Sequence, residues 1–315
     1  MEKVKLIESK SEIAAGTRGA SLGVDALKTA CLDKGSDYFA LYDAIEVENE
    51  NDLLFEGVQY EHAKFIDGVL TMEERVCDAT YDTLKEGYFP IILAGDHSTA
   101  AGSICGIKKA FPDKRLGVIW IDAHADLHSP FTTPSGNMHG MPLAMVCGVD
   151  NIDFKINNPS DEVLEYWEKL KNVGLPGPKV HPSDLVFIAI RDTEEPEEKI
   201  IEKYNILKIK TEEVKNRGVK LIAREALDAL KECDMIYISF DVDSMDSNIS
   251  EGTGTPVPNG LTVEEAKALN AALIVDKKIC AWEMVEVNPT LDSLNLMAEN
   301  AFDILESTTN HLLER

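Results

Sequence analysis

The sequence predicts a three-layer α/β/α fold built on a mainly parallel β-sheet. Two observations indicate this fold class. Short apolar runs alternate along the chain with longer amphipathic segments, and acidic residues or histidines follow directly after several of these runs. Such alternation is typical of a parallel sheet flanked by helices, whose ligand sites lie beyond the carboxyl ends of the strands.

Each expected strand is a short run rich in apolar and β-branched residues. In chain order the strands are expected at residues 4–7, 89–93, 117–121, 185–190, 206–209, 235–240 and 278–285. The intervening helices are expected in amphipathic segments at residues 24–32, 63–86, 101–110, 159–171, 221–231, 263–274 and 293–313. Residues 148–182 are rich in Asn, Pro and Gly and are interpreted as an elaborated crossover, so residues 1–315 are expected to form a single domain.

Composition excludes several classes of function. The net charge of −25 argues against nucleic-acid binding, which needs a basic surface to neutralise phosphates. The six cysteines are scattered without a CxxC pair, as expected for reduced, mostly buried residues. The first twenty residues lack a continuous apolar run, and no later run approaches membrane-spanning length, so no membrane partner and a cytoplasmic location are expected.

Two clusters of acids and histidine predict a metal centre. Asp-Ala-His-Ala-Asp occupies residues 122–126, and Asp-Val-Asp occupies residues 241–243. In an extended segment, side chains at positions i, i+2 and i+4 point the same way, and carboxylates with one or two imidazoles suit manganese. One such triplet could be a solvated loop, but two clusters that each follow an expected strand are much harder to dismiss. The predicted ligands of a pair of divalent ions are His97, Asp122, His124, Asp126, Asp241 and Asp243.

The candidate residues follow four separate strands. His97 lies after residues 89–93, Asp122 after residues 117–121, Asp241 after residues 235–240 and Glu286 after residues 278–285. Because the carboxyl ends of parallel strands meet at one edge of the sheet, these side chains are expected to converge there.

At this point the chain resembles a known family. The segments at residues 94–98, 122–126, 135–140, 239–243, 252–256 and 286–289 match, in order, the motifs of the ureohydrolases, which include arginase, agmatinase and formimidoylglutamase. The resemblance runs from about residue 90 to the C-terminus and is closest to arginase, whereas the first eighty residues match weakly. It implies an arginase-like catalytic domain that acts as a homo-oligomer, either a trimer or a hexamer.

The resemblance also implies a site with two Mn²⁺ per chain. Asp122 and Asp241 would bridge the ions, with His97 and Asp126 completing one ion and His124 and Asp243 the other. A metal-bridging hydroxide would then attack the guanidinium carbon. The catalytic residues implied are Asp126, Glu286, which would pair with the guanidinium group, and His139, which would pass a proton to the departing amine.

The resemblance further favours an amino-acid substrate. The residues matching the family's substrate contacts are Thr133, Ser135 and Asn137 for an α-carboxylate, His128 on the same side, Glu194 and Glu197 for an α-amino group, and Thr255 together with Glu286 near the guanidinium. L-arginine, cleaved to L-ornithine and urea, is therefore the expected substrate. Two positions depart from arginases, which usually have aspartate where this chain has Glu194 and asparagine where it has His128.

Four other functions stay open. N-formimidoyl-L-glutamate, which would give glutamate and formamide, has two carboxylates and no free α-amine, so its pocket should contain an additional basic group. Agmatine has no carboxylate for residues 133–137 to bind. A catalytically silent regulatory relative would be expected to lack a ligand, His139 or Glu286, and none is missing; a single-zinc deacetylase would not need the second set of ligands.

Overall fold

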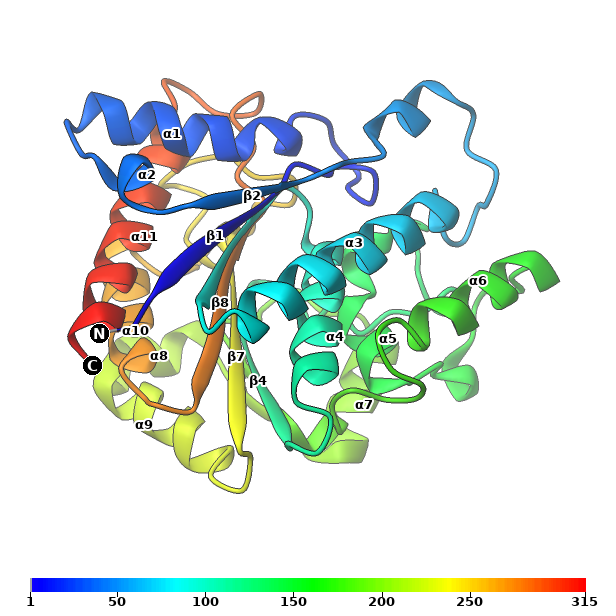
Figure 1. The fold of residues 1–315 in the computed structure, drawn as a ribbon. Coiled ribbons are helices and arrows are strands. Elements are labelled where there is room, and N and C mark those ends of the chain that lie inside the picture. Colours follow the sequence, from blue (N-terminus) through cyan, green and yellow to red (C-terminus); the bar gives the residue numbers. More distant parts are fainter. Residues whose placement is uncertain (1) are drawn as a thin grey trace.

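In the computed structural model, which describes residues 2–315, a parallel β-sheet is flanked by helices on both faces (Figure 1). The strands are β1 (Val4–Ser9), β2 (Ala44–Val47), β3 (Phe89–Ala94), β4 (Leu116–Ile121), β5 (Leu185–Ile188), β6 (Leu207–Ile209), β7 (Met235–Asp241) and β8 (Ile279–Val285). Within the described residues they form one eight-stranded sheet in the order β2-β1-β3-β8-β7-β4-β5-β6, and every pair of neighbours is parallel. The predicted α/β fold class is confirmed.

Two groups of helices form the outer layers. One face of the sheet carries α3 (Ile66–Lys85), α4 (Ala100–Ala110), α5 (Pro142–Cys147), α6 (Asp161–Lys171) and α7 (Glu195–Tyr204). The other face carries α1 (Gly23–Asp33), α2 (Tyr38–Leu41), α8 (Thr211–Arg217), α9 (Val219–Ala229), α10 (Val263–Ile274) and α11 (Leu296–Glu314). Each group packs on its own hydrophobic core, so the sheet is buried on both sides.

Strand β4 shows why the apolar runs are continuous. Val118 and Trp120 belong to the core beneath α3 and α4, whereas Ile119 and Ile121 belong to the core beneath α9 and α10. Side chains alternate between the two faces of a strand, and here both faces are covered by helices. A central strand must therefore be apolar at every position, which is the pattern that predicts it from sequence.

Several short elements were not expected from the sequence. The edge strand β2 is only four residues long and mostly exposed, so it lacks a continuous apolar run. Helix α7 was not expected from the sequence either; it begins at Glu195, directly after the loop residues 191–194, and Glu197 Oε2 accepts a hydrogen bond of 3.0 Å from the backbone N–H of Glu194. The predicted strand 185–190 ends at Ile188 because Ala189 adopts a positive φ of 74°.

Two further expectations concern the whole chain. In residues 2–315 all six cysteines are free, and five of them are buried. Across the same residues, none of the helices combines the length and the apolar character needed to cross a lipid bilayer.

Candidate active site

The expected convergence at one edge of the sheet is present. His97 begins a short 3₁₀ helix (His97–Thr99) after β3, Asp122 follows β4, Asp241 is the last residue of β7, and Glu286 follows β8. Strands β3, β8, β7 and β4 are consecutive neighbours in the sheet. Their carboxyl ends therefore bring together residues that are up to 189 positions apart in the chain, as in the hydrogen bond between His97 and Glu286.

Three carboxylates surround the imidazole of His97. Its Nδ1 atom lies 3.0 Å from Asp122 Oδ2, 3.1 Å from Asp126 Oδ2 and 3.2 Å from Asp241 Oδ2. We call these four residues the His97 cluster. All four are buried, and Nδ1 of His97 and Oδ2 of Asp122 have no hydrogen-bond partner among the described residues.

A second cluster shares Asp122 with the first. Nδ1 of His124 lies 3.0 Å from Asp243 Oδ2 and 3.4 Å from Asp122 Oδ1. We call these three residues the His124 cluster. Asp122 offers one oxygen to each cluster, as a bridging ligand would, whereas Asp241 turns Oδ2 to His97 and accepts the backbone N–H of Asp243 at Oδ1 over 2.7 Å.

The electrostatics of the two clusters suit a divalent cation. Burial, together with the negative charges of its neighbours, raises the pKa of Asp241 well above its usual value and that of Asp243 to about 6. Although burial opposes their charged forms, the surrounding carboxylates raise the pKa values of His97 and His124. Buried carboxylates so close together repel one another, and a cation among the unpartnered ligand atoms would relieve that repulsion. The donor set of carboxylates and imidazoles therefore fits the implied metal ions.

Side chains beneath the His97 cluster hold the imidazole in place. Its ring stacks on Trp120, with centroids 4.0 Å apart and planes at 4°, and its Nε2 lies 2.7 Å from Ser239 Oγ. On the same strand as Ser239, Tyr237 donates its hydroxyl to Glu283. The sequence predicts no role for Trp120 or Tyr237, because within a strand they look like ordinary core positions. A hydrogen bond at Nε2 leaves Nδ1 of His97 as the atom that faces the carboxylates.

Two candidate residues have strained backbones. Asp126 has a φ of 50° and Glu286 a φ of 67°, the left-handed region that residues with a side chain rarely adopt. The backbone N–H of Glu286 donates to Gly95 O over 2.9 Å, which ties this turn to the loop that precedes His97. Strain of this kind is commonly retained where it positions functional side chains.

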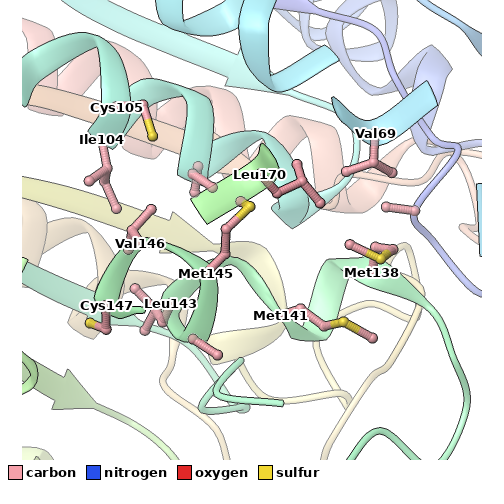
Figure 2. Packing of buried hydrophobic residues seen from close by; sticks show 14 of the residues in the cluster. Val69, Ile104, Cys105, Met138, Met141, Leu143, Met145, Val146, Cys147 and Leu170 are labelled. Atoms are coloured by element: carbon pink, nitrogen blue, oxygen red, sulfur yellow. The ribbon is translucent and has the colours of Figure 1, made fainter. Parts of the chain in front are cut away.

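Glu286 and His139 contact each other. Glu286 Oε1 lies 3.1 Å from His139 Nδ1 and accepts the backbone N–H of His97 over 3.0 Å. Its Oε2 atom is buried and has no partner within residues 2–315. On either side of His139, Met138 and Met141 are anchored in the buried cluster under α3 and α4 (Figure 2). His139 is thus held on a fixed turn while 18% of its side chain stays exposed.

The predicted site residues line one cavity, except for Asp122 and Glu286, which are buried and do not line it. Thr133, Ser135 and Asn137 lie along one loop of the lining, and Thr255 donates to Asp243 Oδ2 over 3.1 Å at the end formed by the His124 cluster. A cavity into which several polar groups converge suits a small molecule.

The two departures from the arginase motifs are in contact with each other. His128 Nε2 lies 2.9 Å from Glu194 Oε2, and its Nδ1 lies 3.1 Å from Thr132 Oγ1. The hydrogen bond from His128 lowers the pKa of Glu194 to about 2. Burial raises the pKa of Glu197 to about 8, and both of its oxygens accept backbone N–H groups, from Leu127 and Glu194. Glu197 therefore has less capacity than Glu194 to bind a substrate amine.

Arg191 braces the wall behind Asp243. Among the described residues, its guanidinium donates only to backbone carbonyls, including Asp243 O at 2.7 Å and Val257 O at 2.8 Å. Beside it, Asp192 Oδ2 lies 3.8 Å from His124 Nε2. Sequence reasoning passed over both residues, although their place directly after the expected strand at residues 185–190 offered the same signal as the other strand-end residues.

Comparison with known proteins gives a consistent result. The Arginase family model matches residues 4–309. Arginase from Bacillus subtilis strain 168 is 32% identical over 308 residues, covering 96% of each chain. The crystal structure of Entamoeba histolytica arginase with L-ornithine superposes with a TM-score of 0.84 at 25% identity, covering 98% of this chain and 99% of that one. A formimidoylglutamase structure from Bacillus subtilis shares the fold, with a TM-score of 0.75 at 19% identity over 99% of this chain and 87% of that one.

Proposed function

Because the chain belongs to the arginase family, whose members hydrolyse guanidino compounds with the help of metal ions, we propose that it cleaves L-arginine to L-ornithine and urea. The proposal extends to a pair of Mn²⁺ ions held by the His97 and His124 clusters. Bound there, the ions would lower the pKa of a shared water and so supply the nucleophile. A cytoplasmic homo-oligomer with one catalytic domain per chain stays part of the proposal.

The observation that carries the choice of substrate is that the hydroxyl groups of residues 133–137 accept hydrogen bonds from the protein but donate none within residues 2–315. Thr133 Oγ1 accepts the backbone N–H of Gly136 over 2.9 Å, and Ser135 Oγ accepts that of Asn137 over 3.1 Å. Within the described residues neither hydroxyl donates to a protein acceptor, so each keeps its O–H for a ligand. A wall of hydrogen-bond donors suits a carboxylate, which arginine has and agmatine lacks.

Glu286 would bind the guanidinium end. Its Oε1 is fixed by His97 and His139, which leaves the buried, unpartnered Oε2 available. A guanidinium N–H pointing to this oxygen would satisfy it with a charge-assisted hydrogen bond. This contact would hold the planar group against the metal ligands and restrict its rotation.

His139 would carry the proton that the departing amine requires. Its Nδ1 faces Glu286, so the proton would be held and delivered at Nε2 on the partly exposed side of the ring. An imidazole can gain and lose this proton near neutral pH, and transfer by a positioned group is worth about 10²- to 10⁴-fold in rate.

Hydrolysis of N-formimidoyl-L-glutamate is the second candidate, and His128 is the observation that favours it. Burial opposes its charge, but Glu194 and Glu197 raise the pKa of this imidazole, which gives the cavity a basic group. A second substrate carboxylate could use it. The contact with Glu194 points the other way, because that acid already occupies Nε2 and would repel a carboxylate.

A product assay on manganese-loaded protein tests the proposal. L-arginine, N-formimidoyl-L-glutamate and agmatine are offered separately, and products are identified by mass spectrometry. Urea and ornithine from arginine alone are expected, with loss of activity after chelation and recovery on adding two equivalents of Mn²⁺. Formamide and glutamate as the products would transfer the assignment to the second candidate, and no product from any substrate would reject both.

A further inference from the structure

Lys64 contacts residues 133–137, which we call the donor wall, from outside the cavity. Its Nζ donates to Asn137 Oδ1 over 3.0 Å, although the two residues are 73 positions apart in the chain. An ammonium group can only donate, so this contact requires the oxygen of the Asn137 amide to face Lys64 and the NH₂ group to face away. Across residues 2–315 that NH₂ group donates to no protein acceptor.

Gly16 provides space for this orientation of Asn137. A Cβ atom at position 16 would lie 2.7 Å from Asn137 Nδ2, closer than side chains tolerate. Asn137 thereby matches Thr133 and Ser135, because its acceptor is occupied by the protein while its donor is left for a ligand.

The Lys64 segment is attached to the wall by its backbone as well. Lys64 N donates to Gly136 O over 2.8 Å, and Gly136 has a φ of +76° with the carbonyl of Glu61 only 2.0 Å from where a Cβ atom would stand. Residues 61–64 and 133–137 are therefore packed together, and the position of Nζ relative to Asn137 does not depend on a free side chain alone.

Lys64 also adds positive charge where acids predominate. The chain carries a net charge of −25, yet in the described part of the chain no carboxylate forms an ion pair with Lys64. A half-buried ammonium behind a row of hydrogen-bond donors attracts a carboxylate and does nothing for an uncharged group at the same place.

We infer that Lys64 is a specificity-determining residue that orients Asn137 and supplies the positive charge for recognition of the substrate's α-carboxylate. The inference rests on the proposed function, because it assigns Asn137 to that carboxylate. Lys64 acts from behind Asn137 and does not itself line the cavity.

The test uses Lys64→Met, which removes the charge and the donor at similar length, and Lys64→Arg, which keeps both. Lys109→Met is the matched control, since this lysine pairs with Asp78 on the surface between α3 and α4. L-ornithine and putrescine, which differ only by the carboxylate, are the probes. Their dissociation constants are measured by calorimetry on manganese-loaded protein, next to KM and kcat for L-arginine.

Lys64→Met is expected to weaken ornithine binding and raise KM for arginine by about tenfold, the size of one charge-assisted contact. Putrescine binding, kcat and manganese content are expected to change less than twofold, and Lys64→Arg to restore most of the loss. Equal effects on ornithine and putrescine, or no effect on either, would overturn the inference. If the wild-type protein releases no urea from arginine, the proposed function is rejected. The comparison of ornithine with putrescine binding would still test the role of Lys64.

Discussion

The base of the cavity, formed by the His97 and His124 clusters, and its rim, formed by residues 128, 133–137 and 194–197, are built differently. At the base, Asp122 and Asp241 are 1% and 2% exposed and lie at the ends of neighbouring central strands. At the rim, Ser135 is exposed, and the side chain of Glu194 is 54% exposed on a loop that enters α7. The base is fixed by sheet register, whereas the rim residues lie on loops that follow the strands and at the start of α7. The two departures from arginase motifs both lie at the rim, where Glu194 is exposed and His128 is buried.

The largest effect is expected from a change at the base. Asp243→Ala removes a carboxylate that contacts His124 and accepts from Thr255, so bound manganese and urea production should fall together, with activity lower by about 10³-fold or more. Metal content by mass spectrometry and initial rates measure this. Asp246→Asn, three residues further along and outside both clusters, is the control. Full metal content with full activity in Asp243→Ala would show that this residue is not a ligand.

His139→Ala separates chemistry from metal binding. The side chain contacts Glu286 but belongs to neither cluster, so the variant should keep its manganese while kcat falls by about 10²- to 10³-fold. Partial recovery of the rate with added imidazole would support proton transfer at this position. A loss of metal equal to the loss of rate would place His139 with the base and contradict the assigned role.

A smaller effect, on stability, is expected from the buried residues that support the His97 cluster. Glu283 is fully buried and accepts hydrogen bonds from the hydroxyl groups of Tyr237, Ser103 and Thr99. Glu283→Leu would leave these hydroxyls without an acceptor and should lower the free energy of unfolding by about 3 kcal/mol, against about 1 kcal/mol for Glu283→Gln, which keeps one acceptor. Urea denaturation of chelated protein excludes effects of the metal. Equal stability of the Leu and Gln variants would mean that this network does not stabilise the base.

The base could be predicted from the sequence because its residues form short motifs within a few positions of one another. Alternating acids and histidines at residues 122–126, placed directly after an apolar run, specify both the direction of the side chains and their position at the sheet edge. The structure brings these residues together with Asp241 as expected. Their function as ligands remains a prediction until metal is measured.

The rim and the supporting residues could not be predicted in the same way, because their roles depend on long-range contacts. Arg191 donates to Asp243 O, 52 positions away in the chain. Ser239 is bonded to the ring of His97, and Lys64 donates to Asn137. Glu197 shows the opposite case, since its acidic character suggested a substrate contact while its oxygens cap α7 and the turn at Leu127. No periodicity in the sequence distinguishes these positions from ordinary surface or core residues.

The smallest effect is expected where the two departures meet at the rim. Because His128 and Glu194 are bonded to each other, changing one should leave the other without its partner, whereas His128→Asn with Glu194→Asp restores the usual arginase pair. The double variant should lower KM for L-arginine by about threefold, and each single variant should raise it, since small displacements of a binding carboxylate matter. Additive effects of the two changes would show that the pair is not coupled. If KM for N-formimidoyl-L-glutamate is lower in the wild type than in the double variant, the His128 and Glu194 pair instead serves that substrate.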